Sequence, residues 1–314
     1  MMKKYISMAL VAITAFAISG CSNEDIQIDQ SLTVTVNPAG VIAPFTYEVN
    51  RGELSTFASA MQLRTRLLVY NDAGKAVVKQ TAYLRDYNDK MTIQPNLPNG
   101  TYTMVALTDV VANGAAYEYW TLSGEEELGT MRLTAVTDNG VLRQGFKNSI
   151  LGVESKKVTI SEQSKTIDLN PTPAGSLICV NFKNLKKFSN IKQLQMRTNQ
   201  TPDFYSFNTQ GQLVGSSNRS DGSSLNGVYL RYNPQEETSE SVVAYLFMMD
   251  TDITAAFAYA LDGETSAHYV GGSEQGRMTK TLRRGVEYEL LLDLDRTTDI
   301  TTDPVFSFEE VSAK

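Results

Sequence analysis

Histidine and cysteine are almost absent from this chain of 314 residues, which contains one histidine and two cysteines. A catalytic pair or triad with an imidazole base would have to use His268. The same counts exclude a zinc site built from several histidines or cysteines. No phosphate-binding or dinucleotide-binding glycine motif is present either. We therefore expect no enzyme activity, no catalytic residue, no metal and no cofactor. Cys179 lies in an apolar run and is predicted to be a buried side chain.

Clusters of positive charge are missing as well. The formal net charge is −7, and the longest basic runs are the pairs Lys186-Lys187 and Arg283-Arg284. Binding to nucleic acid or to an anionic lipid surface depends on a basic patch. We therefore expect neither partner for this chain.

Long apolar runs are limited to residues 6–18, which follow Lys3 and Lys4. A short positive segment followed by an apolar stretch of this kind is typical of a secretory signal peptide. The stretch is shorter than the roughly 20 residues that a transmembrane helix needs. It ends in Ile-Ser-Gly-Cys, which matches the bacterial lipobox and identifies Cys21 as the lipid-bearing residue.

This motif divides the beginning of the chain into two parts. Residues 1–20 are predicted to be a lipoprotein signal peptide, and residues 21–30 a polar tether that begins Cys-Ser-Asn-Glu-Asp. One acyl chain gives only marginal membrane binding, whereas lipoproteins normally carry several chains on this cysteine. Cys21 is therefore expected to hold the protein firmly on a membrane.

The rest of the chain shows the pattern of an all-β protein. Short runs rich in Val, Ile, Thr, Tyr and Phe are separated by Gly, Pro, Asn and Asp, as strands are separated by turns. Only residues 55–66 suggest a short helix. The clearest predicted strands are 32–36, 63–70, 102–107, 157–160, 166–169, 176–182, 191–196, 242–248, 255–261, 278–282 and 286–294.

A proline-rich joint interrupts this pattern near the middle of the chain. Pro171 and Pro173 precede Gly175, and a new set of strands follows. We place a domain boundary here, between an N-terminal β-sandwich at 31–171 and a C-terminal β-sandwich at 172–314. Runs 157–160 and 166–169, just before the joint, are expected to form a pair.

The single aromatic cluster is Tyr117, Tyr119 and Trp120. Tyr117 and Tyr119 would share one face of a strand, where aromatic side chains are favoured as cross-strand pairs. An exposed ladder of the same residues would instead stack on a sugar ring, so the sequence leaves a surface glycan-binding lipoprotein as an alternative. Carboxylates are numerous, which leaves a hydrolase with a carboxylate pair as a weaker one.

Two further motifs extend the pattern. Residues 67–75 read Leu-Leu-Val-Tyr-Asn-Asp-Ala-Gly-Lys, and residues 97–107 read Leu-Pro-Asn-Gly-Thr-Tyr-Thr-Met-Val-Ala-Leu. Together with the lipobox and the acidic residues that follow Cys21, these motifs resemble the fimbrillin superfamily of Bacteroidales. The resemblance is greatest to the minor fimbrial subunit and anchor lipoproteins.

This resemblance implies a fold, an assembly mode and a location. It implies two tandem transthyretin-like, Greek-key β-sandwiches on a lipoprotein of the outer membrane surface. It also implies assembly into a fimbrium by strand exchange with other fimbrial subunits, with strands 286–294 and 305–308 as donors, and a role in adhesion to a host or bacterial surface. Shaft subunits of this superfamily are cleaved ahead of the strand corresponding to 63–70, which makes Arg51-Gly52 a candidate processing site. Anchor or accessory subunits keep their lipid.

Overall fold

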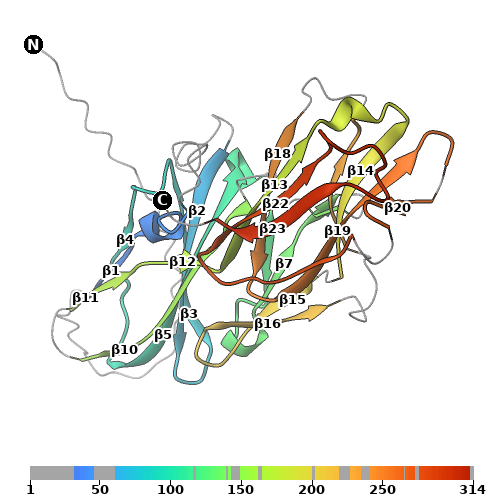
Figure 1. Ribbon diagram of the computed structural model, residues 1–314. Coiled ribbons are helices and arrows are strands. Elements are labelled where there is room, and N and C mark those ends of the chain that lie inside the picture. Colours follow the sequence, from blue (N-terminus) through green and yellow to red (C-terminus); the bar gives the residue numbers. More distant parts are fainter. Residues whose placement is uncertain are drawn as a thin grey trace, which may run out of the picture.

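The computed structural model is all-β, as the sequence predicts (Figure 1). The structure describes residues 32–45, 61–115, 118–138, 141–142, 149–161, 165–199, 202–218, 227–234, 241–264, 266–272 and 276–311. These residues form five sheets, and the helical turns among them are short 3-10 segments such as η1 (Pro38–Val41). Within the same residues, no helix has the length and apolarity to cross a bilayer.

A five-stranded sheet lies at the centre of the N-terminal half. Its order is β12 (Thr172–Pro173), β10 (Gly152–Ile160), β5 (Gly100–Ala112), β2 (Met61–Asn71) and β3 (Ala76–Leu84). The long strands β2 and β5 are antiparallel from Met61↔Ala112 to Asn71↔Tyr102. Both are buried along most of their length, because other layers of the protein cover both faces of this sheet.

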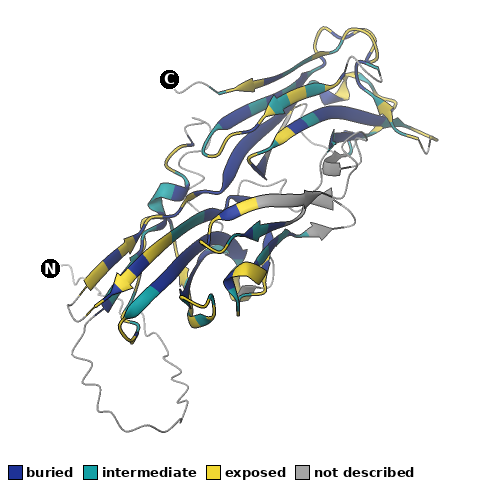
Figure 2. Ribbon diagram, turned by 90° about the horizontal axis from the view of Figure 1, so that it is seen from below, coloured by how far each residue is buried: buried dark blue, intermediate teal, exposed yellow. Residues whose placement is uncertain are grey.

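The central sheet is covered on both faces. One face packs on a three-stranded sheet of β11 (Lys165–Leu169), β1 (Leu32–Val36) and β4 (Met91–Ile93). The other face packs on a four-stranded sheet of β16 (Leu213–Asn218), β15 (Pro202–Phe207), β7 (Arg132–Ala135) and β6 (Trp120–Ser123). Figure 2 shows the buried long strands between their more exposed neighbours.

The C-terminal half contains two further sheets. The first has the order β18 (Val242–Met249), β13 (Gly175–Lys183), β22 (Glu287–Asp293) and β23 (Val305–Glu310). The second has the order β20 (His268–Tyr269), β19 (Asp252–Leu261), β14 (Ile191–Thr198), β17 (Gly227–Tyr232), β9 (Val141–Leu142) and β8 (Thr137–Asp138), with β21 (Met278–Thr281) also paired to β19. Phe182 of β13 meets Phe257 of β19 edge to face, with ring centroids 5.2 Å apart, so these two sheets share a core.

Strand pairing crosses from one half to the other. β15 pairs with β7 at Tyr205↔Leu133, although β15 lies after the proline-rich joint and β7 before it. β17 pairs with β9 in the same way, at Val228↔Val141. The predicted boundary at 171/172 stays a prediction, and the β15–β16 hairpin belongs spatially to the N-terminal half.

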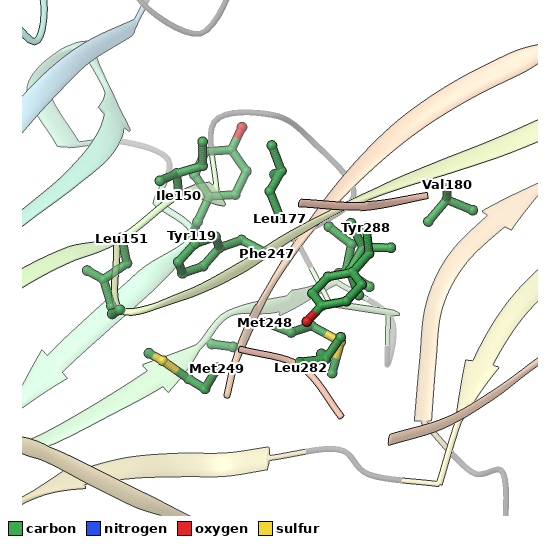
Figure 3. Packing of buried hydrophobic residues seen from close by; sticks show 14 of the residues in the cluster. Tyr119, Ile150, Leu151, Leu177, Val180, Phe247, Met248, Met249, Leu282 and Tyr288 are labelled. Atoms are coloured by element: carbon green, nitrogen blue, oxygen red, sulfur yellow. The ribbon is translucent and has the colours of Figure 1, made fainter. Parts of the chain in front are cut away.

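One hydrophobic core runs through the junction of the two halves. Figure 3 shows Tyr119, Ile150 and Leu151 from the first half beside Phe247 and Met249 from the second. All five side chains are buried. Large apolar side chains therefore exclude water from the interface between the halves, as they do inside one domain.

Two sequence predictions about local structure are wrong. Residues 61–66 of the predicted helix lie in β2, which pairs with β5. Alternate side chains there point to opposite faces of the central sheet, and both faces are covered. The strand at 166–169 does not pair with the one at 157–160. It corresponds to β11, which runs parallel to β1, with Val34 opposite Ile167.

Candidate functional site

The first described strand, β1, is held between two partners. It runs parallel to β11 from Leu32↔Lys165 to Val36↔Leu169 and antiparallel to β4 from Val34↔Ile93 to Val36↔Met91. Both hydrogen-bonding edges of β1 are therefore occupied. Its removal would leave β11 and β4 with unpaired backbone groups facing each other across an empty strand position.

The side chains of β1 follow a strict alternation. Leu32, Val34 and Val36 are 5%, 0% and 0% exposed, whereas Thr33 and Thr35 are half-buried. The three buried side chains join a cluster with residues of the central sheet and of the two flanking strands. That cluster also contains Leu67, Val69, Met91, Leu97, Tyr102, Met104, Ala106, Val158, Ile160, Ile167 and Leu169. An apolar slot with three side-chain positions thus receives β1.

The segment after β1 is fixed near the junction of the halves. The backbone N–H of Asn37 donates to the carbonyl of Leu169 at 2.8 Å, and Val41 and Phe45 are fully buried. Val41 lies directly over β10 at Gly152, where an added Cβ would lie 2.3 Å from Val41 Cγ2. Gly152 is therefore needed so that this segment can cross β10 closely.

A buried ion pair lies on the opposite face of the central sheet. Arg64 of β2 stands directly across from Asp109 of β5, and its Nε and Nη2 donate to the two Asp109 oxygens at 2.9 and 2.6 Å. Arg64 Nη1 donates to Glu118 at 2.8 Å, and Nη2 also donates to the carbonyl of Trp120 at 3.1 Å. Burial alone would lower the pKa of Arg64, but these carboxylates outweigh it and the pKa is raised. This network ties β6 to the central sheet.

Arg66, two residues further along β2, has a different environment. It is 9% exposed, and among the described residues its only ion-pair partner is Asp109, whose Oδ2 lies 4.0 Å from Nη2. Burial lowers the pKa of Arg66, and the charge of Asp109 offsets only part of this effect. Arg66 faces a pocket of about 300 Å³ between the edge of the central sheet and β6.

The predicted aromatic cluster does not form an exposed platform. Trp120 is 1% exposed, and its Nε1 donates to the carbonyl of Ser149 at 2.7 Å. Its ring packs against Phe247 and Tyr205 at 6.4 and 6.0 Å between centroids. Tyr119 is also buried, so neither residue is open to a sugar ring, and the two do not form the exposed ladder that a glycan-binding role would require of them.

Several predicted site residues lie outside the described residues. These are Cys21, Arg51, Gly52 and Tyr117, so lipidation and processing stay predictions. Of the described candidates, Cys179 is buried on β13 as predicted, and His268 is exposed on the short strand β20, where it contacts Glu264. No group of three or more potential metal ligands occurs within the described part of the chain.

Sequence reasoning missed the pair Arg64–Asp109 and its neighbour Arg66. The available signal was the alternation Leu63-Arg64-Thr65-Arg66-Leu67 inside a strand that the central position of the sheet buries on both faces. A buried arginine requires a carboxylate partner, and Asp109 is the acidic residue within the other long apolar strand.

No protein-family model matches this chain, and no curated protein matches it. Its fold is shared with solved structures at low sequence identity. A candidate polysaccharide-binding protein from Bacteroides thetaiotaomicron is 13% identical, with a TM-score of 0.52 over 90% of this chain and 99% of that one. A candidate adhesin from the same species is 11% identical, with a TM-score of 0.51 over 88% and 95%.

The fimbrial anchor protein Mfa2 from Porphyromonas gingivalis is 10% identical, with a TM-score of 0.46 over 88% of this chain and 97% of that one. Several of the structural neighbours are named candidate adhesins or candidate cell-adhesion proteins. At 11–13% identity, the two structures with TM-scores above 0.5 establish the fold alone. The shared fold extends over nearly the whole of both chains, which includes both halves described above.

Proposed function

We propose that this chain is a cell-surface fimbrial subunit without enzymatic activity, an anchor or accessory component that assembles by strand exchange. The observation that carries the proposal is the position of β1. It lies near the beginning of the chain, occupies a slot between β11 and β4, and contributes three buried side chains to it. A strand of another subunit with the same alternation would supply the same backbone and side-chain contacts.

The adhesin-like fold of the neighbouring structures supports a role at the cell surface. The lipobox supports anchoring in the outer membrane through Cys21, with the acidic residues after it facing away from the membrane. Cleavage after Arg51 would cut the chain between β1 and β2 and allow β1 to leave. An uncut chain with its lipid would remain at the base of the fimbrium as an anchor.

The donor strand in this proposal is β23. Of the two strands expected to act as donors, β22 is paired on both sides, with β13 and β23, and is therefore not available. Among the residues that the structure describes, β23 is paired on one side only, with β22, and Val305 is 50% exposed. Phe306 and Phe308 lie two residues apart, which is the spacing of the side chains that β1 places in its slot.

A mixing experiment tests the exchange. Chains that lack residues 1–51 provide the empty slot, and intact chains or purified fimbrial subunits from the same cell provide donors. Complexes that survive SDS without heating are expected, because exchanged strands dissociate slowly. Phe308→Asp in the donor should abolish them, whereas Glu309→Gln, at an exposed position of the same strand, should not. Absence of such complexes with every donor would overturn the proposal.

The alternative of a surface glycan-binding lipoprotein loses the aromatic residues that first suggested it. Trp120 and Tyr119 stabilise the junction of the two halves, so their substitution would disturb folding rather than ligand binding. A carboxylate hydrolase has no specific observation in its favour.

A further inference from the structure

The pocket beside Arg66 lies where β3 extends beyond the sheet that covers the central sheet. Arg64 is paired in register with Tyr83, and Arg66 with Thr81, so these four residues share one face. The covering sheet buries the β2 part of this face and leaves the β3 part exposed. The opening between them is lined by Arg64, Arg66, Thr81, Tyr83, Glu118, Thr121, Leu122 and Glu125.

The floor of this pocket is rigid. Arg64 is held by Asp109, Glu118 and the Trp120 carbonyl, and Glu118 also accepts a hydrogen bond from Thr121 at 3.1 Å. These contacts connect three strands. The pocket is therefore shaped before any ligand arrives, which lowers the entropic cost of binding.

Arg66 is the group in the pocket with unused hydrogen-bonding capacity. A guanidinium has five N–H donors, and in the described structure this one makes a single long ion-pair contact at 4.0 Å. The side chain is 11% exposed, so few directions remain from which an acceptor can approach it. An acceptor can reach the guanidinium of Arg66 only from the pocket.

The balance of charge around the pocket decides which acceptor fits. The lining carries two positive charges, on Arg64 and Arg66, and two negative charges, on Glu118 and Glu125. Asp109 is buried behind Arg64 and adds a third negative charge. An added carboxylate or phosphate would meet net repulsion at this short range. A neutral group that both donates and accepts hydrogen bonds would satisfy Arg66 and the glutamates together.

Tyr83 completes the arrangement with a flat apolar surface. It is 51% exposed at the edge of the pocket, on the strand that carries Thr81. A sugar ring presents neighbouring hydroxyl groups, which can bridge an arginine and a carboxylate. Its flat face packs on an aromatic side chain, so this pocket offers the groups that a sugar ring needs. The volume of about 300 Å³ lies at the small end of ligand sites, which range over roughly 300–1,000 Å³.

We propose that this pocket binds a neutral saccharide unit, with Arg66 and Glu125 hydrogen-bonded to its hydroxyl groups and Tyr83 stacked on its ring. This site is separate from the slot of β1, which lies on the opposite face of the central sheet. Strand exchange and saccharide binding can therefore fail or succeed independently.

Saturation-transfer NMR on the full chain, solubilised in a detergent without a sugar headgroup, tests the proposal. The probes are the methyl glycosides of glucose, galactose, mannose and N-acetylglucosamine, with methyl glucuronide as the anionic counterpart of the glucoside. At least one neutral glycoside is expected to bind. Tyr83→Ala and Arg66→Gln should each weaken it about tenfold or more, because each removes a main contact.

Val77→Ser is the matched control, since Val77 is 46% exposed on the same strand and outside the pocket. It should leave binding unchanged. Tyr83→Ala changes an exposed side chain, so it keeps the test valid even if Arg66→Gln reduces stability. The proposal would be overturned if none of the neutral glycosides bound, or if the glucuronide bound more tightly than the glucoside. It would also be overturned if the Tyr83→Ala and Arg66→Gln variants bound the glycoside as tightly as the unchanged chain does.

Discussion

Replacement of Val34 by Asp is expected to release β1 from its slot while the rest of the chain stays folded. Val34 is fully buried at the centre of β1, opposite Ile167 on one side and Ile93 on the other. An ionised carboxylate at this position would lie among apolar side chains with no basic partner in the cluster. Thr35→Asp places the same charge on the half-buried outer face of the same strand.

The size of the effect follows from the contacts of β1. Burial of Leu32, Val34 and Val36 contributes roughly 5–9 kcal/mol, at about 1.5–3 kcal/mol for each side chain. Fixing the backbone of five residues costs roughly 5–10 kcal/mol. The two terms nearly cancel, and the ladder hydrogen bonds, at about 0.5–1.5 kcal/mol each, leave β1 docked by a few kcal/mol.

An unpaired charge buried in this slot costs several kcal/mol. That cost exceeds the docking energy of β1 alone, but it is avoided once β1 leaves the sheet. The chain should therefore lose the strand rather than unfold as a whole.

Hydrogen exchange followed by mass spectrometry measures this directly. Peptides covering 32–36 should exchange rapidly in Val34→Asp, whereas peptides from β5 should stay protected. In Thr35→Asp both regions should behave as in the unchanged chain. The reasoning would be refuted by continued protection of β1 in Val34→Asp, by its equal loss in Thr35→Asp, or by simultaneous loss of protection in β5.

Three further predictions concern other parts of the molecule. Asp109→Asn should lower the free energy of unfolding in urea by about 3–5 kcal/mol, because it removes the buried carboxylate that pairs with both Arg64 and Arg66 and leaves Arg64 only the more exposed Glu118. Lys75→Gln should change it by less than about 1 kcal/mol, because it breaks only an exposed ion pair; equal effects would contradict the structural assignment. Phe207→Ala should cost about 3–5 kcal/mol, and the fluorescence of Trp120 should change at the same urea concentration as the far-UV circular dichroism, whereas two separate transitions would show that the halves unfold independently. Intact-mass analysis of protein taken from its native cell surface should find a chain that begins at lipidated Cys21, and Cys21→Ser should remove the protein from the membrane fraction; a start at Gly52 would instead indicate a processed, polymerising subunit.

Local sequence patterns were sufficient to locate many of the strands. The alternation Leu-Thr-Val-Thr-Val places β1 at its observed bounds, and the apolar run of 176–182 predicts β13 to within a residue at each end. These signals work because alternation and β-branched residues report how a strand meets its own core. The all-β class follows from the same signals.

Strand partners were not predictable in this way. β1 pairs with β11, more than 130 positions away in the numbering, and the contact is parallel, so no turn between the two strands marks it. β15 pairs with β7 of the other half in an antiparallel contact, but the two strands are far apart in the sequence and no turn joins them directly. Register between distant strands depends on how whole faces pack, and a short window of sequence does not contain that information.

The candidate site shows the same limit. The sequence left open whether Trp120 was part of a packed aromatic cluster or of an exposed ladder, and the structure surrounds it with Phe247 and Tyr205, which come from the other half. It overlooked Arg66 because an arginine in a strand usually points to solvent, and only the covering sheet makes it part of a pocket. Exposure is a property of the assembled layers rather than of the strand alone.

The β15–β16 hairpin has a mechanical consequence. Two domains that are joined only by one flexible linker can bend relative to each other at that linker. Here the chain passes the junction and then returns, so that Tyr205 and Phe207 are locked into the core of the first half while Gln210, at the tip, accepts a hydrogen bond from Ser155 of β10. Bending at the junction would have to tear β15 from β7. The protein should therefore act as a stiff strut, which transmits a pull or a torque from one end to the other instead of absorbing it at a hinge.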